Sequence, residues 1–336
     1  MPEFVMDARA PFDFASTARF LRFTEAEVVD TFAGGRYARA IHFGERLFLL
    51  SVESEGTASR PSLRVKLAPE RFVTPRLLDE ATRVVRDMFS LEHDLAHWRA
   101  LLVRDPFMRR LETDHRGLRL PRWPSLFEAT VTSILLQQIA TSVAITFRRR
   151  VVERYGETLQ AGGETYRAFP RAATLARASV EELRALGLSN AKATCIIEVA
   201  RACAGGALDS ATLAREDNES VIARLTSLRG IGRWTAEWVL MLHFGRRDVF
   251  PAADLFLRGV VVKHYNRGGA MNEREIRALA AKRWGGFESY VALYFLAGMR
   301  AGTITLKPER VLSSKQSDAK PTHRAQRKTT DPRDET

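Results

Sequence analysis

The sequence predicts an α+β fold, in which a small antiparallel sheet is followed by about 200 residues of short helices. Two hydrophobic periods support this prediction. From residue 37 to residue 67 apolar and polar side chains alternate, as where Leu63, Val65 and Leu67 are separated by basic residues. Beyond Pro75 the apolar residues recur every three or four positions, which is the period of an amphipathic helix. The chain therefore changes from strands to helices near residue 75.

Turn and cap residues predict where the individual elements begin and end. Breaks between strands are expected at Gly34-Gly35, Gly44 and Gly56. In the helical part, an N-cap residue stands three positions before an acid at Ser125, Ser179 and Asn272. Helices are expected to end near Gly187, Gly205-Gly206, Gly245 and Gly285-Gly286.

The composition is that of a globular protein without a cofactor motif. The 336 residues are 45% hydrophobic and 27% charged, which excludes a disordered, collagenous or coiled-coil chain. Cys195 and Cys203 are too few for a disulfide framework, a four-cysteine zinc site or an iron–sulfur cluster. The histidines show no metal-ligand spacing. We therefore expect no metal and no organic cofactor.

The charge balance indicates a polyanionic partner. There are 52 Lys and Arg residues against 40 Asp and Glu residues, a net charge of +12, which favours nucleic acid. No apolar run approaches the roughly 20 residues that a membrane span needs, and the first residues lack a signal-peptide pattern. We expect a cytoplasmic protein with a mixed α/β domain at 1–104, a helical domain at 105–312 and a disordered basic tail at 313–336.

One segment has the pattern of a phosphate anchor. Residues 225–236 read LTSLRGIGRWTA, a helix, a tight turn with two glycines and a second helix. Gly230 and Gly232 permit positive φ and leave the amides bare, so that a phosphate can approach them at the start of the second helix. Arg229 and Arg233 flank this anion site. The ordinary alternative is a turn that serves only helix packing.

Asp254 follows 22 residues after Gly232, in a proline-containing loop before another predicted helix. A helix N-cap would be a sufficient explanation for this aspartate if it stood alone. Near a phosphate anchor, however, a carboxylate can face the sugar of an extruded nucleotide. There it would stabilise the oxocarbenium charge that develops when an N-glycosidic bond breaks, or deprotonate the attacking water.

These motifs resemble the helix–hairpin–helix DNA glycosylase superfamily, and within it the bacterial 3-methyladenine DNA glycosylase II, or AlkA, type. The hairpin and the distal Asp254 carry the resemblance. Supporting matches, from about Pro11 to Ala301, are the segments PFDF (11–14), GLRLP (117–121), ILLQQ (134–138) and ALGL (185–188), the last followed by Lys192-Ala193. The resemblance implies two helical lobes behind the N-terminal sheet domain, with a DNA groove and base pocket between the lobes.

The resemblance implies hydrolytic removal of alkylated purines from duplex DNA by base flipping, as the first step of base excision repair. Asp254 would be the catalytic carboxylate, and Trp234, Trp238 and Phe20 would wall the base pocket. A pocket tryptophan of the family is replaced by Leu296, which leaves the lesion range open. Strand-cutting members carry a lysine where this chain has Trp234, so the resemblance implies a glycosylase without lyase activity.

The remaining expected contacts are to the DNA. The hairpin residues Arg229, Gly230, Gly232, Arg233 and Thr235 would bind the backbone. Gln137 and Gln138 stand where the family inserts a wedge into the duplex, and Gln138 is the preferred wedge, with two surface amides as the alternative. The family often holds a monovalent cation on hairpin carbonyls, which these residues neither indicate nor exclude.

Two other functions stay open at this stage. A glycosylase of the same fold could act on deaminated or oxidised bases, and a non-catalytic helix–hairpin–helix protein could bind DNA with Asp254 as a cap only. We expect a monomer without an obligate protein partner, because one lesion needs one pocket. The sequence does not indicate whether etheno bases are accepted, whether DNA damage induces expression, or whether the hairpin binds a cation.

Overall fold

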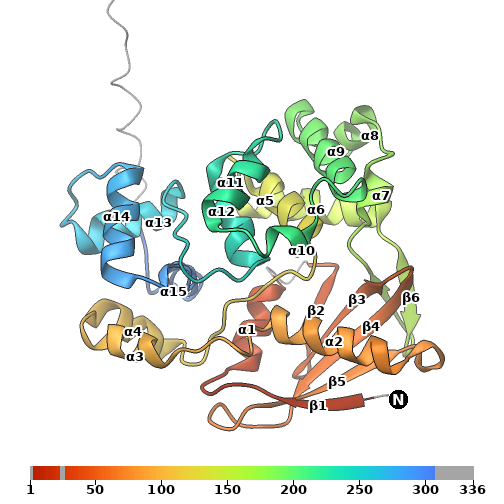
Figure 1. Cartoon of the computed structure of the whole chain (residues 1–336), viewed down its shortest axis with the longest axis horizontal. Coiled ribbons are helices and arrows are strands. Elements are labelled where there is room, and N and C mark those ends of the chain that lie inside the picture. The colour runs from red at the N-terminus through yellow and green to blue at the C-terminus, as the bar shows by residue number, and fades with distance from the viewer. Residues whose placement is uncertain (1–2, 23–26, 307–336) are drawn as a thin grey trace, which may run out of the picture.

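The computed structural model describes residues 3–22 and 27–306, and it confirms the α+β class (Figure 1). A five-stranded antiparallel sheet in the order β1-β5-β4-β3-β2 forms the N-terminal part. Its strands are β1 (Glu3–Asp7), β2 (Asp30–Ala33), β3 (Arg36–Phe43), β4 (Arg46–Ser54) and β5 (Ser62–Ala68).

The alternation in β5 separates a buried face of the sheet from a more exposed one. Leu63, Val65 and Leu67 are fully buried, whereas the residues between them are partly exposed. The buried face shares a core with α1 (Phe14–Leu21) and α2 (Pro75–Met88). Helix α2 begins at Pro75, where Thr74 caps the first turn. As predicted, its apolar stripe faces the core.

Helices make up most of the rest of the described chain, after a short 3₁₀ turn, η1 (Glu70–Phe72). They are α3 (Ala96–Val103), α4 (Pro106–Asp114), α5 (Leu126–Leu136), α6 (Thr141–Tyr155), α7 (Ala172–Leu175), α8 (Val180–Ala185), α9 (Asn190–Ala204), α10 (Ser210–Leu213), α11 (Asn218–Thr226), α12 (Arg233–Leu242), α13 (Leu255–Tyr265), α14 (Glu273–Trp284) and α15 (Glu288–Arg300).

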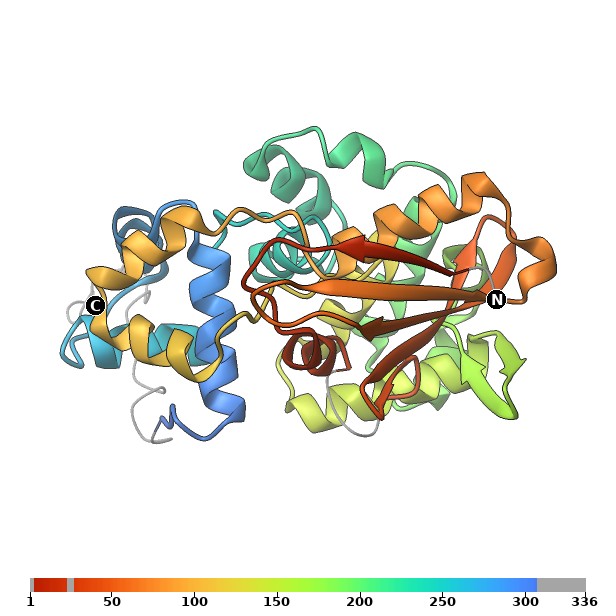
Figure 2. The same ribbon diagram turned by 90° about the horizontal axis from the view of Figure 1, so that it is seen from below.

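Two hydrophobic cores divide these helices into the two lobes that the resemblance implied. One core lies among α5, α6, α8, α9 and α11, and the other among α3, α4 and α13–α15, which stand apart in Figures 1 and 2. Helix α12 contributes to both cores: Ala236 and Val239 face the first, and Trp238 and Met241 face the second. The hairpin helix is therefore the element that joins the lobes.

The predicted caps and stops are confirmed with one modification. Ser179 and Asn272 form complete capping boxes with the acids three positions on. Ser125 accepts the amide of Glu128, but the Glu128 side chain does not return the bond, because it is engaged elsewhere. The four expected glycine positions follow the ends of α8, α9, α12 and α14.

The expectation that only helices follow residue 75 is wrong at one place. Strands β6 (Thr158–Ala161) and β7 (Glu164–Arg167) form an antiparallel hairpin around Gly162-Gly163, both with positive φ. This hairpin packs against β3 and β4, and Ala168 bridges Ala40. The glycine pair between two short polar strands was the available signal for a hairpin.

A chain of buried charges joins the sheet to the first helical lobe. Arg39 of β3 donates to Asp30 at 3.1 Å and to Glu128 of α5 at 2.7 Å. Arg148 of α6 donates to the second oxygen of Glu128 at 2.7 Å and also pairs with Glu27. Burial raises the pKa of Asp30 to about 6. Each acid of this chain, which we call the Arg39 network, faces an arginine.

Some sequence predictions concern boundaries and termini. The predicted tail at 313–336 lies outside the described residues, and the boundary at 104 stays a prediction. Helix α3, just before that boundary, packs with α4.

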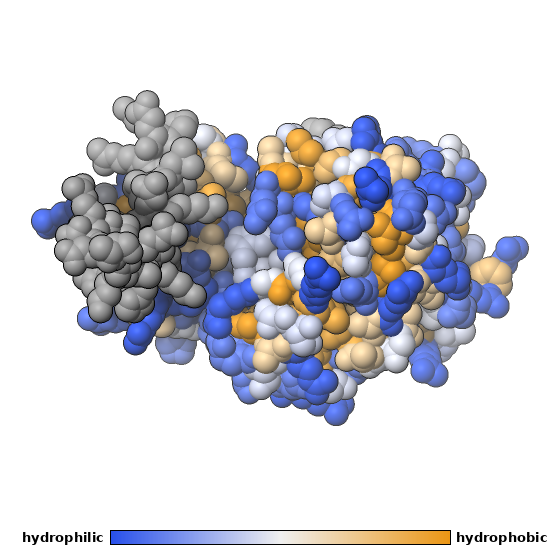
Figure 3. Space-filling view, turned by 90° about the horizontal axis from the view of Figure 1, so that it is seen from above, coloured by the Kyte–Doolittle hydropathy of each residue, from blue (hydrophilic) through white to orange (hydrophobic). Residues whose placement is uncertain are grey.

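Within residues 3–22 and 27–306, no helix combines the length and the apolar character that a membrane crossing would require. Most of the face shown in Figure 3 is hydrophilic, with apolar patches between polar residues.

Candidate active site

The two glycines of the hairpin have different reasons to be glycine. Gly230 has φ 90° and lies so close to α9 that an added Cβ would stand 3.1 Å from Cys195 Sγ. Gly232 has φ −97°, so it does not use the positive φ that a glycine permits. An added Cβ at Gly232 would meet nothing within 4 Å. The protein's own packing leaves this position open, which suits the close approach of a ligand.

The start of α12 offers unpaired backbone donors at that open position. Gly232 is its N-cap and supplies no side-chain bond to the first-turn amides. Such amides carry partial positive charge and suit an anion. Arg229 is exposed beside them, and Thr235 is buried behind them, where its hydroxyl accepts a hydrogen bond from Gln137 at 2.8 Å.

Arg233, expected at the same anion site, is held by carboxylates. Its guanidinium donates to Glu219 at 2.9 Å and to Glu237 at 2.9 Å. The hydrogen bond to Glu219 is the main cause that raises the pKa of Arg233 well above the usual range. Arg277 donates to the same oxygen of Glu237, and these groups line a cavity of about 180 Å³. Because its charge is already paired with two carboxylates, Arg233 should attract an anion less strongly than Arg229 does.

Asp254 is a half-buried carboxylate whose hydrogen-bond donors are all neutral groups. It N-caps α13, because Oδ1 accepts the amides of Phe256 at 3.0 Å and Leu257 at 3.1 Å. Oδ2 accepts the indole N–H of Trp234 at 3.2 Å. Burial raises the pKa of Asp254 above the usual 3.8, and these three hydrogen bonds oppose the rise. One oxygen of this side chain thus serves the cap, and the other accepts the indole N–H.

The Trp234 contact brings two of the expected site residues together. Trp234 lies in the first turn of α12, directly after the hairpin, so the expected phosphate anchor and Asp254 are linked through one indole. The rings of Trp234 and Trp238 meet edge to face, with centroids 6.1 Å apart. Trp238 is 9% exposed and packs in the second core, while Trp234 is half-buried.

The third residue assigned to the pocket wall and the leucine that replaces a pocket tryptophan also border the second core. Phe20 of α1 and Leu296 of α15 are half-buried against it. The guanidinium of Arg300 lies over the Phe20 ring, 4.0 Å from its centroid. One face of Phe20 is therefore already covered by a cation. That any of these residues contacts a base stays a prediction.

The two glutamines after α5 have different surroundings. Gln137 Nε2 donates to the Gly230 carbonyl at 3.0 Å and to Thr235, so its amide is part of the hairpin's support. Gln138 is exposed and has φ 55°, a left-handed conformation that is uncommon for a residue other than glycine. Gln138 is thus the amide of the pair that points to solvent.

Lys192 lies at this place without having been assigned a role from the sequence. Its ammonium group donates to the carbonyl oxygens of Leu135 at 2.6 Å and Gln137 at 2.9 Å. Burial lowers its pKa to about 8. A lysine in the first turn of a predicted helix was the available signal, because helix dipoles disfavour a cation there.

Two protein-family models match the sequence. Residues 131–285 match the HhH-GPD superfamily base excision DNA repair protein model, and residues 3–125 match the AlkA N-terminal domain model. DNA-3-methyladenine glycosylase 2 of Escherichia coli is 28% identical over 87% of this chain and 95% of its own length. DNA-3-methyladenine glycosylase of Bacillus subtilis is 28% identical over 64% of this chain and 71% of its own length.

Solved structures with the same architecture include a 3-methyladenine DNA-glycosylase from Archaeoglobus fulgidus. It superposes with a TM-score of 0.78 at 26% identity and covers 90% of this chain and 100% of that one. An 8-oxoguanine glycosylase/lyase of Clostridium acetobutylicum in complex with double-stranded DNA has a TM-score of 0.71 at 16% identity, covering 90% and 99%. At that identity the second similarity concerns the fold alone.

Proposed function

Because the chain belongs to the HhH-GPD superfamily of base excision DNA repair proteins and carries the AlkA N-terminal domain, we propose that it is a DNA glycosylase for alkylated purines. Its substrate would be duplex DNA with bases of the 3-methyladenine and 7-methylguanine type. The observation that carries the proposal is the half-buried Asp254 carboxylate, which is joined through Trp234 to the hairpin. A packing turn and a simple cap would not require this link.

DNA would be held by the start of α12. A phosphate would accept hydrogen bonds from the first-turn N–H groups of α12. The open space at Gly232 allows its close approach, and the exposed Arg229 would add a positive charge. The damaged nucleotide would leave the stack, at a cost of a few kcal/mol, and Gln138 would fill the gap. Because the Gln138 side chain carries both donors and acceptors, it could hydrogen-bond the base left without its partner.

In the chemical step, water adds to C1′ of the sugar and the purine leaves with the electrons of the N-glycosidic bond. The carboxylate of Asp254 would stabilise the positive charge on the sugar or take a proton from the water. Neutral donors suit this task, because they orient the carboxylate without cancelling its charge. An arginine in their place would weaken the field at the sugar.

Selectivity would come from stacking and from the leaving group. An alkyl group on N3 or N7 makes a purine cationic, so its bond to the sugar is weak and its ring is attracted to electron-rich faces. Trp234, Trp238 and Phe20 would provide these faces. Leu296 offers no aromatic face, and we propose a lesion range centred on bases that leave easily rather than on bases that need tight recognition.

We propose that the reaction stops at an abasic site. A lyase needs an amine that attacks the sugar, and the position that carries a lysine in lyases of the family holds Trp234. The indole nitrogen is no nucleophile, and it already donates to Asp254. We further propose a monomer that acts in the cytoplasm.

The test is release of free bases from methylated duplex DNA, resolved by chromatography, by the wild type and by Asp254→Asn. We expect methylpurines from the wild type alone, with strand breaks only after alkali. Breaks before alkali would contradict the absence of lyase activity. Equal release by both proteins would remove Asp254 from the mechanism.

The same experiment separates the two rival functions. Duplexes that contain a deaminated or an oxidised base replace the methylated duplex in a parallel reaction. Release from these duplexes alone would favour a glycosylase of the same fold for another lesion. No release from any duplex, together with tight DNA binding, would favour a non-catalytic binding protein.

A further inference from the structure

The Lys192 ammonium group joins the start of α9 to the end of α5, where the turn that carries Gln138 begins. Its two acceptors are the carbonyl oxygens of Leu135 and Gln137. Carbonyls in the last turn of a helix have no partner within that helix. Lys192 supplies the partner from 55 residues further along the chain, and its positive charge also faces the negative end of the α5 dipole.

Within its own helix, Lys192 is unfavourably placed. Ser189 caps α9 by accepting the Lys192 amide, so the ammonium group belongs to the first turn, where the helix dipole repels a cation. The side chain is also half-buried, and burial disfavours its charged form. The helix dipole and burial both disfavour the charged Lys192 side chain within α9, and its hydrogen bonds to the end of α5 compensate for this cost.

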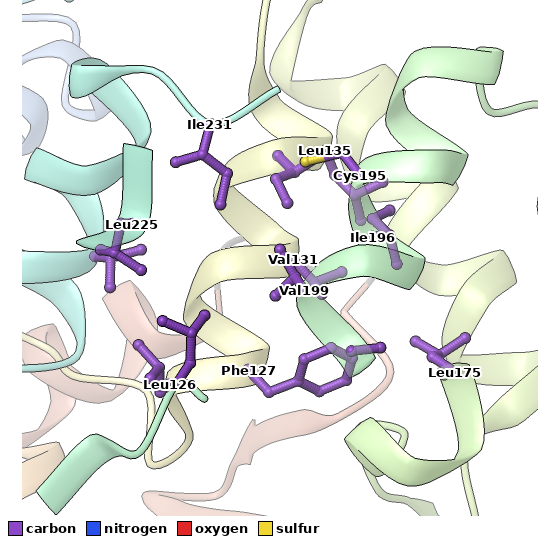
Figure 4. Close-up of a cluster of buried hydrophobic side chains, with 14 of the residues drawn as sticks. Leu126, Phe127, Val131, Leu135, Leu175, Cys195, Ile196, Val199, Leu225 and Ile231 are labelled. Carbon is purple, nitrogen blue, oxygen red and sulfur yellow. The ribbon is translucent and has the colours of Figure 1, made fainter. Parts of the chain in front are cut away.

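A second tie fixes the same turn from the hairpin side. The Gln137 amide donates to the Gly230 carbonyl and the Thr235 hydroxyl, while the Gln137 carbonyl accepts from Lys192. Beneath these polar contacts, Leu135, Cys195 and Ile231 converge from α5, α9 and the hairpin (Figure 4). The end of α5 therefore cannot shift without breaking contacts to both neighbours.

Gln138 is the next residue, and it is both exposed and left-handed, with φ 55°. Such a backbone is strained for a residue other than glycine and persists where its surroundings impose it. Here the surroundings are the fixed peptide of Gln137 on one side and the start of α6 on the other. The turn is thus built to present one amide to solvent.

We propose that Lys192 is a positioning residue for base extrusion: together with Gln137 it holds the turn after α5 so that Gln138 enters the duplex. The inference rests on the proposed function, in which Gln138 fills the gap left by the flipped nucleotide. Lys192 acts through that turn and touches neither the DNA nor the reacting atoms. Its loss should therefore impair extrusion and leave general DNA affinity intact.

The experiment compares Lys192→Met, Gln138→Ala and the double variant on a duplex with one alkylated purine. We expect each single variant to lower the single-turnover rate constant of base release roughly 10- to 100-fold, since misplacement by about 1 Å has effects of this size. The double variant should be no slower than the slower single variant, because both changes remove one insertion step. Multiplied losses would overturn the inference.

A fluorescence readout distinguishes positioning from a merely structural role. In an Asp254→Asn background, 2-aminopurine next to the lesion should brighten on binding as the stack opens. We expect Lys192→Met to lose this rise at saturating protein while its affinity for undamaged duplex changes by less than about twofold. A full rise combined with weaker binding to every duplex would overturn the inference.

Lys263→Met is the matched control, because Lys263 also donates to a backbone carbonyl, that of Thr305 at 3.0 Å, in the other lobe. It removes the same charge and should keep the wild-type rate. Lys192→Arg keeps the charge with another geometry and should give an intermediate rate. Gln137→Ala cuts the second tie, so it tests the turn should Lys192→Met fail to fold.

The inference and the proposed function fail in different ways. A wild type that releases no base would overturn the proposed function. A wild type that releases base at the same rate as Lys192→Met would leave the function standing and overturn the role of Lys192.

Discussion

The Arg39 network buries the carboxylates of Asp30 and Glu128, the Asp254 site half-buries one carboxylate, and the two regions surround these groups in opposite ways. In the network, Arg39 and Arg148 pair with Glu27, Asp30 and Glu128 across a contact between two parts of the fold, so that each acid faces an arginine. At the site, Asp254 receives two amides and an indole N–H, which orient the carboxylate without neutralising it. The difference separates burial that holds the fold together from burial that keeps a charge ready for chemistry.

The largest expected effect is on the network. Arg39→Met leaves Asp30 and Glu128 buried without that partner, so we expect the free energy of unfolding to fall by about 3–5 kcal/mol. Denaturant unfolding measures it. Arg149→Met, which removes an exposed pair with Glu153 at 4.0 Å, is the control and should cost less than about 1 kcal/mol. Equal losses would show that the network is no more than a surface pair.

The second prediction applies the same measurement to Asp254. Its raised pKa means that the folded state disfavours the charged form, so the charge opposes folding at neutral pH and this penalty fades as the pH falls. Asp254→Asn keeps an N-cap without the charge, and we expect stability equal to the wild type or higher. Asp254→Ala loses the cap and should be about 1 kcal/mol less stable than the Asn variant. A destabilised Asn variant would contradict the comparison.

A smaller effect concerns the two hairpin arginines. Arg229 is exposed, so Arg229→Ala should reduce the slope of log affinity against log salt by about 0.9, the value for one phosphate contact. Arg233 is already paired with Glu219 and Glu237, so its removal should change the slope less. Titrations of duplex DNA at several salt concentrations measure both. An unchanged slope for Arg229→Ala would place that residue outside the interface.

The smallest expected effect is a displacement of the acidic limb of base release. Release should decline as Asp254 is protonated, at a pH above the usual range of an aspartate. The Trp234 hydrogen bond lowers this pKa, so Trp234→Phe should move the limb to higher pH while it keeps an aromatic face. Rate against pH for the two proteins is the measurement. A limb that moves to lower pH would mean that another group titrates.

The sequence predicts those parts of this molecule that depend on neighbours along the chain. Helix caps such as Ser179 and Asn272, the period change near Pro75 and the hairpin at Gly230 are local patterns, and the structure has them. The two lobes followed from the resemblance rather than from periodicity. Position 232 shows the limit even of a local motif, because neither its backbone φ nor the packing around it requires the glycine.

Contacts between distant segments could not be predicted in this way. Arg39 and Glu128 are 89 residues apart, and Lys192 and Gln137 are 55 apart, and no periodicity links such pairs. Arg233 reads as a DNA contact from its place in the motif, but Glu219, on the preceding helix, engages it once the hairpin folds. Side-chain roles at the site therefore depend on packing that one sequence does not encode locally.

The second lobe also has a consequence for the order of synthesis. Helices α3 and α4 pack against α15, although the whole first helical lobe lies between them in the chain. At about 5–20 residues per second, the ribosome needs on the order of 10–35 seconds to make the intervening segment. During this interval the apolar faces around Trp98 and Leu111 lack α15, against which they pack in the complete lobe. Until α15 is synthesised, the nascent chain therefore exposes apolar surface of the kind that chaperones bind.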